Sequence, residues 1–355
     1  MDSDVIARLK NLHEWVAPSH GLKIETIDAH SGGQPLRLIL NGLPPTRGKT
    51  QIERWKYAGK HFDHIRKALL FEPRGHVDMY GCLLTPPQRS DSHFGALFIH
   101  RGGFSPMCGH GVIALTTIVL EAGIVDMKAP ETRIKIDTPA GLVRCYGQIE
   151  DDRVKKVFFE NVPSFVVAEG ESVEVAALGL TVSYELAYGG AFFAFVKVEE
   201  INLTCTPENM TDLIIAGHAI REAISEQMEF THPISSDLGF LFGVVFVDKP
   251  VRRRLGTAQS RHVCVFSEGC VDRSASGMAI SARLALMHHQ GKINAGERFV
   301  VEGIVGSTFS GRIVAASEEH GHPAVTVEIE GSAYITGKHT FFMNPDDPWM
   351  EGFLL

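Results

Sequence analysis

The sequence predicts an α+β fold with much antiparallel sheet, built from two similar halves. Short runs of β-branched and other apolar residues, bounded by Gly, Pro or Asp, recur along the 355 residues and are typical of strands. Helix-like segments are fewer and do not alternate with the strands as in a βαβ fold. A shift of 168 residues, which carries position 108 to 276, brings two similar segments into register.

The expected elements follow in chain order. No GxGxxG or GxxxxGK[ST] motif follows any of the predicted strands, which argues against the common nucleotide-binding loops. We expect helices at 50–69, 111–122, 208–227 and 278–290. We expect strands at 36–42, 95–103, 133–141, 155–163, 192–200, 241–250, 261–267, 298–307, 311–317 and 324–335.

Each repeated unit is predicted to contain a strand, a loop, a turn of small residues and an apolar helix that ends at a glycine. The helix predicted at 111–122, GVIALTTIVLEA, is apolar on nearly every side, which indicates burial from all directions. Gly123 and Gly291 then end the two helices in the left-handed conformation. The shift aligns Phe98 with Phe266, Cys108 with Ser276, Gly109 with Gly277, Ala114 with Ala282 and Gly123 with Gly291.

A second repeat relates HSGGQPLRLIL (30–40) to AYGGAFFAFVK (187–197). We expect the seam between the halves within 161–175. The first half is then 1–165, joined by a C-terminal strand at about 338–355, and the second half is 166–337. A chain of this length is expected to form two domains.

The composition excludes several classes of protein. The chain is 44% hydrophobic and 21% charged, with a formal net charge of -8 and no basic block, which argues against a nucleic-acid partner. The N-terminus, MDSDVIARLKNLHEWV, lacks the apolar stretch of a secretion signal or membrane anchor, so we expect a cytoplasmic protein. Six cysteines without CxxC pairs indicate reduced thiols, with Cys82, Cys145 and Cys264 expected in the core.

The turn SPMCGHGVIAL (105–115) carries the first chemical signal. The N–H groups at a helix start lack partners and carry about half a positive charge, which favours an anion. Gly109 and Gly111 leave those amides open, so a carboxylate can bind there beside Cys108. The same field lowers the pKa of a thiol. We therefore predict that Cys108 is functional and partly ionised near neutral pH.

The equivalent turn, RSASGMAISARLAL (273–286), carries Ser276 in place of a second cysteine. Two such turns facing each other would form a carboxylate cradle between positions 108 and 276. Ser276 is either functional or a simple N-cap. Asp272 either binds a substrate ammonium, which we favour, or forms the turn. His110 either tunes the thiol or supplies only its backbone N–H.

These motifs resemble those of the proline racemase family. MCGHG (107–111) and DRSASG (272–277) are similar to its two site motifs, of which the second usually reads DRSPCG. The resemblance covers about 24–350 and also includes HSGGQPLR, EPRGHVDMYG, DTPAGLV and GSTFSGRI. It implies the diaminopimelate-epimerase-like fold, two halves each with strands wrapped around a central helix. It further implies no metal or organic cofactor, usually a homodimer, and a small cyclic amino acid such as proline or a hydroxyproline as substrate.

The resemblance also implies roles for individual residues. Cys108 matches the first catalytic cysteine of the family, and Asp272 matches the residue that holds the ring nitrogen. His76, in EPRGH, is a further possible site residue, although a structural hydrogen bond to a loop carbonyl is the favoured role. The backbone amides around the carboxylate match Gly109, His110, Gly277 and Met278.

Ser276 departs from the two-thiol pattern of a racemase. A hydroxyl without a neighbouring base is a weak acid and base near neutrality. In this family, Thr at the second position is associated with dehydration of trans-3-hydroxy-L-proline, and Ser is its nearest chemical relative. We therefore expect a lyase of hydroxyproline catabolism that forms Δ1-pyrroline-2-carboxylate after Cys108 removes the α-proton.

Three alternatives remain open. The first is a 4-hydroxyproline 2-epimerase or proline racemase that uses the Cys108/Ser276 pair. The second is a catalytically silent carboxylate-binding protein that keeps the cradle. The third is a metal hydrolase, but EEHGH (318–322) and MHHQ (287–290) lack HExxH spacing, so we expect no metal.

Overall fold

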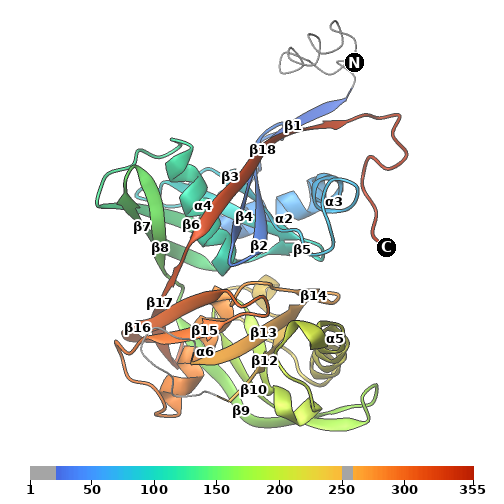
Figure 1. Cartoon of the computed structure of the whole chain (residues 1–355), viewed down its shortest axis with the longest axis vertical. Coiled ribbons are helices and arrows are strands. Elements are labelled where there is room, and N and C mark those ends of the chain that lie inside the picture. The colour runs from blue at the N-terminus through green and yellow to red at the C-terminus, as the bar shows by residue number, and fades with distance from the viewer. Residues whose placement is uncertain (1–20, 250–258) are drawn as a thin grey trace, which may run out of the picture.

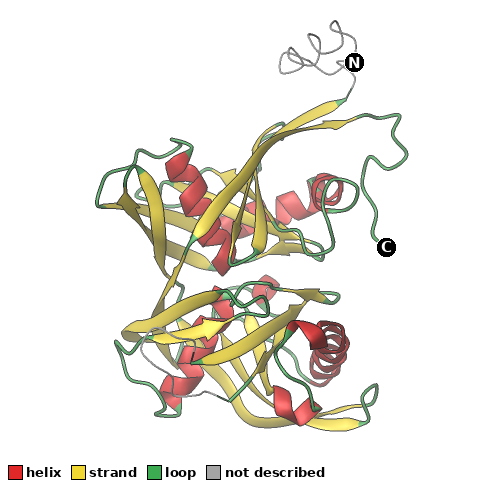
Figure 2. Cartoon of the chain, in the orientation of Figure 1, coloured by secondary structure: helices red, strands yellow, loops and turns green. Residues whose placement is uncertain are grey.

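The structure, a computed structural model, describes residues 21–249 and 259–355. Within these ranges the molecule has two parts stacked one above the other, each with a helix surrounded by strands (Figures 1 and 2). Hydrogen bonds join the described strands into one sheet that runs through both parts. Most neighbouring strands are antiparallel, and β2–β3, β4–β6, β11–β12 and β13–β15 are parallel.

The first part surrounds helix α4 (Gly109–Glu121), whose residues from Gly109 to Leu120 are all buried. This confirms the burial expected from its uniformly apolar sequence. The outer helices are α2 (Gln51–His61) and α3 (Asp63–Leu70). The strands are β1 (Leu22–Ser31), β2 (Gln34–Asn41), β3 (Gly81–Thr85), β4 (Phe94–His100), β5 (Gly103–Ser105), β6 (Glu131–Thr138), β7 (Gly141–Glu150) and β8 (Arg153–Glu160).

The second part surrounds helix α6 (Gly277–His289) and carries α5 (Met210–Gln227) on its outer side (Figure 1). Short 3-10 helices lie at Val198–Ile201, Pro207–Asn209 and Ser236–Leu238. The strands are β9 (Ser164–Val175), β10 (Leu180–Tyr188), β11 (Phe192–Lys197), β12 (Leu241–Val247), β13 (Ser260–Phe266), β14 (Cys270–Val271), β15 (Phe299–Glu302), β16 (Thr308–Glu319) and β17 (His322–Gly331).

Two strand pairings connect the parts. β17 pairs with β8 of the first part, and β18 (Ala333–Met343) then returns to pair with β1 from Ser31 opposite Ala333 to Leu22 opposite Met343. The return therefore begins at Ala333, ahead of the position near 338 considered from sequence. The division into two domains at 165–166 and 337–338 stays a prediction.

Three of the strands that sequence reasoning did not predict share one feature. β7, β9 and β10 each alternate buried and exposed residues over part of their length, with polar or charged side chains on the exposed face. Searching for continuous apolar runs detects strands buried on both faces and misses strands covered on one face only. β9 also occupies residues 164–175 of the segment in which the seam was expected.

The helix expected at 50–69 is two helices. Phe62 ends α2 and precedes α3 with a φ of -120°, and its side chain is buried. Thr50 and Glu53 form a capping box at the start of α2, in which each side chain accepts a backbone N–H of the other residue. The chain turns at Phe62 because this residue packs into the core instead of continuing the helix.

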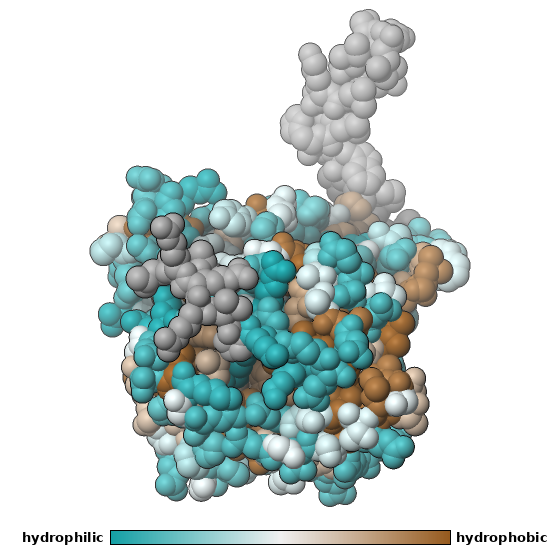
Figure 3. Space-filling view, turned by 60° about the horizontal axis from the view of Figure 1, so that its bottom comes forward, coloured by the Kyte–Doolittle hydropathy of each residue, from teal (hydrophilic) through white to brown (hydrophobic). Residues whose placement is uncertain are grey.

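The surface and the cysteines complete the description. The face turned forward in Figure 3 is largely hydrophilic, with hydrophobic groups gathered toward one side.

All six cysteines are free and buried, which confirms the core positions expected for Cys82, Cys145 and Cys264. In the part of the chain that the structure describes, no helix is long and apolar enough to cross a bilayer. The stretch read as lacking a signal or anchor lies outside the described residues.

Candidate active site

Helices α4 and α6 meet at their first residues. A Cβ atom placed on Gly109 would lie 2.7 Å from the Cα of Gly277 and 3.1 Å from the N of Met278. Only residues without a side chain permit this approach. The two repeated turns are therefore brought together as the sequence repeat predicts, with the amide-rich ends of both helices at one place.

Cys108 lies immediately before α4 with an extended backbone, and its side chain is only 1% exposed. Its Sγ lies 3.4 Å from Nδ1 of His110. A Cβ on Gly111 would lie 2.9 Å from this sulfur and 2.7 Å from the ring of Phe98. Gly111 is therefore required to make room for the thiol between the helix and β4.

Asp272 completes a buried row of three side chains that spans the two repeated turns. Its Oδ2 lies 3.6 Å from His110 Nδ1. Its Oδ1 accepts hydrogen bonds from the N–H and the hydroxyl of Ser274, at 2.9 and 2.7 Å. His110 thus stands between the Cys108 thiol and the Asp272 carboxylate, so its ring contacts the other half as well as its own turn.

Burial and mutual contact set the charges of this row. Burial raises the pKa of the Cys108 thiol, although the His110 ring and the Gly111 N–H act in the opposite direction. Burial also disfavours the His110 cation, but Cys108 and Asp272 outweigh it and raise the pKa of His110 to about 10. Against its own burial, His110 and Ser274 keep the pKa of Asp272 below the ordinary value.

This result corrects one expectation. The helix field was expected to leave Cys108 partly ionised near neutral pH, but loss of solvent outweighs that field in the closed site. In this row Asp272 keeps its carboxylate charge and favours the His110 cation, whereas burial opposes ionisation of the Cys108 thiol. The base form of Cys108 therefore requires a change in its surroundings.

Ser276 occupies the N-cap position of α6, but its hydroxyl caps no helix amide. Its backbone is left-handed, with a φ of 44°, and its N–H donates to the Ser274 hydroxyl. The side chain is 5% exposed and hydrogen-bonds the Cys264 thiol. Burial raises the pKa of Cys264 well above its ordinary value, so this thiol provides no base for Ser276.

His262 is a site residue that sequence reasoning missed. Its Nε2 lies 2.6 Å from the carbonyl of Ala275, the residue before Ser276. Burial lowers the pKa of His262 to about 3, so the ring is neutral and its Nε2–H donates to this carbonyl. The sequence does carry a signal for this residue. His262 is a polar residue in an apolar strand, and the 168-residue shift aligns it with Phe94 of the first half.

The EPRGHVDMYG segment reaches the site through residues other than His76. His76 is exposed, and its Nδ1 accepts the Asp78 N–H, whereas donation to a loop carbonyl was the expected role. Asp78 forms an ion pair of 2.9 Å with Arg273, next to Asp272. The Tyr80 ring is buried and packs edge-on against His110, with ring centroids 4.7 Å apart.

The two Gly-Gly turns also support the site, each in contact with the other half. A Cβ on Gly32 would lie 3.0 Å from the Cβ of Ser274. A Cβ on Gly190 would lie 3.4 Å from the sulfur of Met278 and 3.6 Å from the Cβ of Met107. The structure thus brings together all the predicted site residues except His76, and their catalytic roles stay predictions.

Comparison with known proteins agrees with the family resemblance seen in the sequence. The profile of the proline racemase family, described as "Proline racemase", matches residues 26–354. A trans-3-hydroxy-L-proline dehydratase of Colwellia psychrerythraea is 42% identical over 334 residues, which covers 94% of this chain and 93% of the relative.

Two solved structures share the fold over nearly the whole chain. A probable proline racemase from Agrobacterium radiobacter, with bound carbonate, has a TM-score of 0.88 and 31% identity. A hydroxyproline epimerase from Agrobacterium vitis, with bound trans-4-hydroxy-L-proline, has a TM-score of 0.87 and 28% identity. Each match covers 94% of this chain and 96% of the other. The fold expected from sequence is confirmed.

Proposed function

The chain belongs to the proline racemase family, and we propose that it dehydrates trans-3-hydroxy-L-proline to Δ1-pyrroline-2-carboxylate. The observation that carries this proposal is the asymmetry of the two site turns. The first turn supplies Cys108 with His110 beside it, whereas the second turn has Ser276 at the equivalent position, and the Ser276 hydroxyl has a protonated thiol as partner. One face of the substrate therefore has a group able to move a proton, and the other face has none.

The substrate carboxylate binds at the starts of α4 and α6. The backbone amides of Gly109, His110, Gly277 and Met278 lie in the first turns of the two helices, where N–H groups lack helical partners. Both helix dipoles favour a negative charge at this point. The closed packing of Gly109 on Gly277 means that the halves move apart to admit the ligand.

Asp272 binds the ring ammonium, and this step activates Cys108. Without ligand, Asp272 pairs with His110 at 3.6 Å. A substrate ammonium competes for the same carboxylate, which leaves the His110 cation facing the thiol at 3.4 Å. A nearby cation favours the ionised form of a thiol. Cys108 then loses its proton to solvent before the site closes.

The dehydration uses one thiolate for two proton transfers. In trans-3-hydroxy-L-proline the α-hydrogen and the 3-hydroxyl lie on the same face of the ring. The Cys108 thiolate takes the α-proton, and the electrons of that bond form the Cα–Cβ double bond as the C3–O bond breaks. The thiol returns the proton to the leaving hydroxide, which departs as water, and the enamine tautomerises to the imine. Ser276 hydrogen-bonds the ligand or a water.

We also propose that the enzyme is cytoplasmic and acts as a homodimer without a metal or organic cofactor. The six free cysteines support a reducing compartment. The resemblance to the family supports the dimer and the cofactor-independent chemistry.

Product analysis tests the function directly. The purified protein is incubated with trans-3-hydroxy-L-proline and with the 4-hydroxyprolines, and imine formation is followed with a trapping reagent. We expect an imine from the first substrate and little inversion of the others. Inversion of 4-hydroxyproline at Cα without imine formation would support the epimerase alternative, which the structural similarity to a hydroxyproline epimerase favours at the level of the family.

A further inference from the structure

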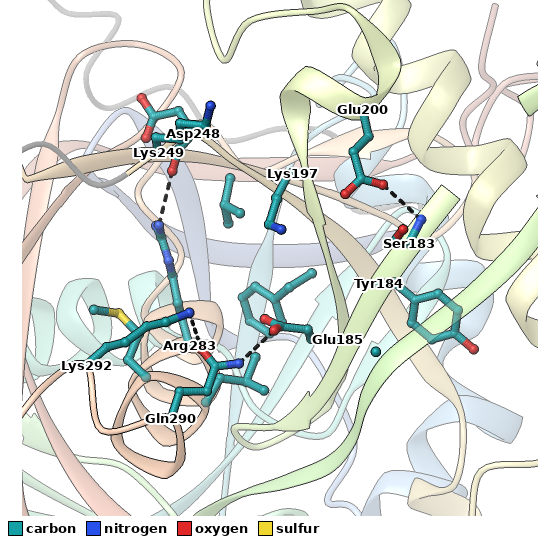
Figure 4. Close-up of a pocket in the computed structure, with 15 residues that line it drawn as sticks. Ser183, Tyr184, Glu185, Lys197, Glu200, Asp248, Lys249, Arg283, Gln290 and Lys292 are labelled. Carbon is teal, nitrogen blue, oxygen red and sulfur yellow. Dashed lines mark hydrogen bonds between the residues drawn. The ribbon is translucent and has the colours of Figure 1, made fainter. Parts of the chain in front are cut away.

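A cavity lies in the C-terminal half of the molecule, beside the later turns of α6 and not at the helix start that follows Ser276. Its volume is about 320 Å³, and it lies between β10, β11, the end of β12 and the later turns of α6 (Figure 4). None of its lining residues takes part in the proposed reaction. The apolar part of its wall includes Phe195, Val247, Leu286 and Met287.

Arg283, on α6, is a buried cation that lines this cavity and lacks an anionic hydrogen-bond partner. Its Nη2 donates to the Ser260 hydroxyl at 2.6 Å and to the Asp248 carbonyl at 3.4 Å. Its guanidinium lies 5.2 Å from the centre of the Phe299 ring. Its Nη1 has no hydrogen-bond partner among the described residues. Burial lowers the pKa of Arg283 to about 10, which shows how poorly its charge is solvated.

The carboxylates around the cavity are already occupied by other donors. Glu185 accepts from the Gln290 amide at 2.6 Å, and Glu200 accepts from the Ser183 N–H at 2.9 Å. The Asp248 carboxylate accepts from the Ser260 hydroxyl and the Arg261 N–H. The charges of Asp248 and Glu185 act on the Arg283 guanidinium, but neither carboxylate accepts a hydrogen bond from its Nη1.

Lys197 supplies a second cation, which is exposed and has no partner among the described residues. It projects from the end of β11 and has no ion-pair or hydrogen-bond partner within the described ranges, whereas Lys292 of the same cavity donates to Gln290 at 2.6 Å. In Figure 4, Lys197 and Arg283 face the same open volume from different elements. Buried charges are normally paired, so the unpaired Nη1 of the buried Arg283 indicates an absent anion, and the exposed Lys197 adds a second positive charge at the same cavity.

We propose that this cavity binds a small organic anion, an oxyanion carried on a compact apolar body. The oxyanion lies between Arg283 and Lys197, and the apolar body packs against Phe195 and Leu286. Because α6 begins at Gly277, the occupied cavity stabilises the helix that supplies half of the carboxylate cradle. The proposal does not depend on the reaction proposed above.

Calorimetric titration of the full-length protein tests this site. The probes are phenylphosphate and benzoate, with phenol as the uncharged body and inorganic phosphate as the anion without a body. We expect one site per chain for phenylphosphate or benzoate, with inorganic phosphate at least about tenfold weaker and no binding of phenol. The tighter of the two aromatic anions identifies the preferred oxyanion.

Variants locate the binding. Lys197→Gln should weaken it about fivefold, and Arg283→Met should remove it, because each variant loses one cation at the oxyanion. Lys60→Gln, at an exposed lysine of α2, is the matched control and should bind as the wild type does. If Arg283→Met fails to fold, the binding measured for Lys197→Gln alone tests the proposal. Absence of binding at about 10 mM probe, unchanged binding in Lys197→Gln, or displacement of the probe by trans-3-hydroxy-L-proline would overturn the proposal.

Discussion

Gly109 and Gly277 lie against each other where α4 and α6 begin, so close that a Cβ on Gly109 would lie 2.7 Å from the Cα of Gly277. Residues that are 168 positions apart and equivalent in the repeat are thus in direct contact. The closed site depends on both positions having no side chain.

Replacing Gly109 by Ala should therefore force the two helices apart. We expect a loss of about 1–3 kcal/mol of unfolding free energy, typical of overpacking, and a large fall in kcat/KM. Urea unfolding and imine formation measure the two effects. Gly59→Ala is the matched control, because its Cβ would meet nothing closer than 3.8 Å and Ala favours the helix. Equal behaviour of the two variants would contradict this role for Gly109.

The Ser276→Cys substitution should add the missing thiol to the second face. We expect it to raise the rate of Cα inversion of 4-hydroxyproline, because a thiol exchanges protons near neutrality far more readily than a hydroxyl does. Chiral chromatography of the product measures the change. Cys108→Ser should abolish both reactions, with ligand binding retained. If Ser276→Cys leaves inversion unchanged or lowers it, then Ser276 already works as an acid–base group.

The pH dependence of turnover should report Cys108. Since burial raises the pKa of this thiol, kcat/KM should rise with pH on the alkaline side of neutrality. His110→Gln removes a neighbouring cation and should move that rise to higher pH. Initial rates across pH 6 to 10 check the direction. A profile that falls over this range, or that stays in place in His110→Gln, would exclude Cys108 as the base.

Stability should depend on pH through His110. Its folded-state pKa of about 10 exceeds the ordinary value of 6.5. Its contribution to the free energy of unfolding is therefore complete below pH 6.5 and is lost as the pH rises through about 10. Denaturant unfolding of the wild type and of His110→Gln at several pH values measures this contribution. The difference between the two proteins should shrink toward pH 10, and a constant difference would show that the His110 charge does not stabilise the fold.

His262 should act as a positioning residue for Ser276. His262→Phe leaves the buried Ala275 carbonyl without its donor, which costs about 1–3 kcal/mol of unfolding free energy. We expect kcat to fall with little change in KM, because the cradle amides remain. His262→Gln, which keeps an N–H donor, should recover part of kcat. A fall in stability with unchanged kcat would reduce the role of His262 to folding alone.

The buried ion pair of Arg37 and Asp28 should be the main electrostatic support of the β1–β2 hairpin. Arg37 donates to both oxygens of Asp28, and its Nη1 donates to the carbonyls of Leu69 and Arg74. Arg37→Met should cost about 3–5 kcal/mol, since it leaves the buried Asp28 carboxylate without its guanidinium partner. Arg133→Met breaks an exposed pair and should cost about 1 kcal/mol or less. Comparable losses in urea unfolding would contradict this assignment.

Much of the site could be predicted from sequence because its signals are local. A thiol followed by glycines at the start of a uniformly apolar helix is visible in residues 105–122, and the repeat supplies its counterpart at 273–286. His76 was the exception. Its neighbours Asp78 and Tyr80 are buried and reach the site instead, whereas His76 is exposed.

The amino-acid sequence by itself determined the α+β class, the two related turns, the exchange of a thiol for a hydroxyl at 276 and the family. Only the tertiary structure decided that His110 lies between Cys108 and Asp272, that burial keeps the thiol protonated, and that His262 holds the backbone before Ser276. The reason is physical. Helix starts, strand patterns and nucleophiles are properties of neighbouring residues, whereas burial and the pairing of charges arise when distant segments exclude water together.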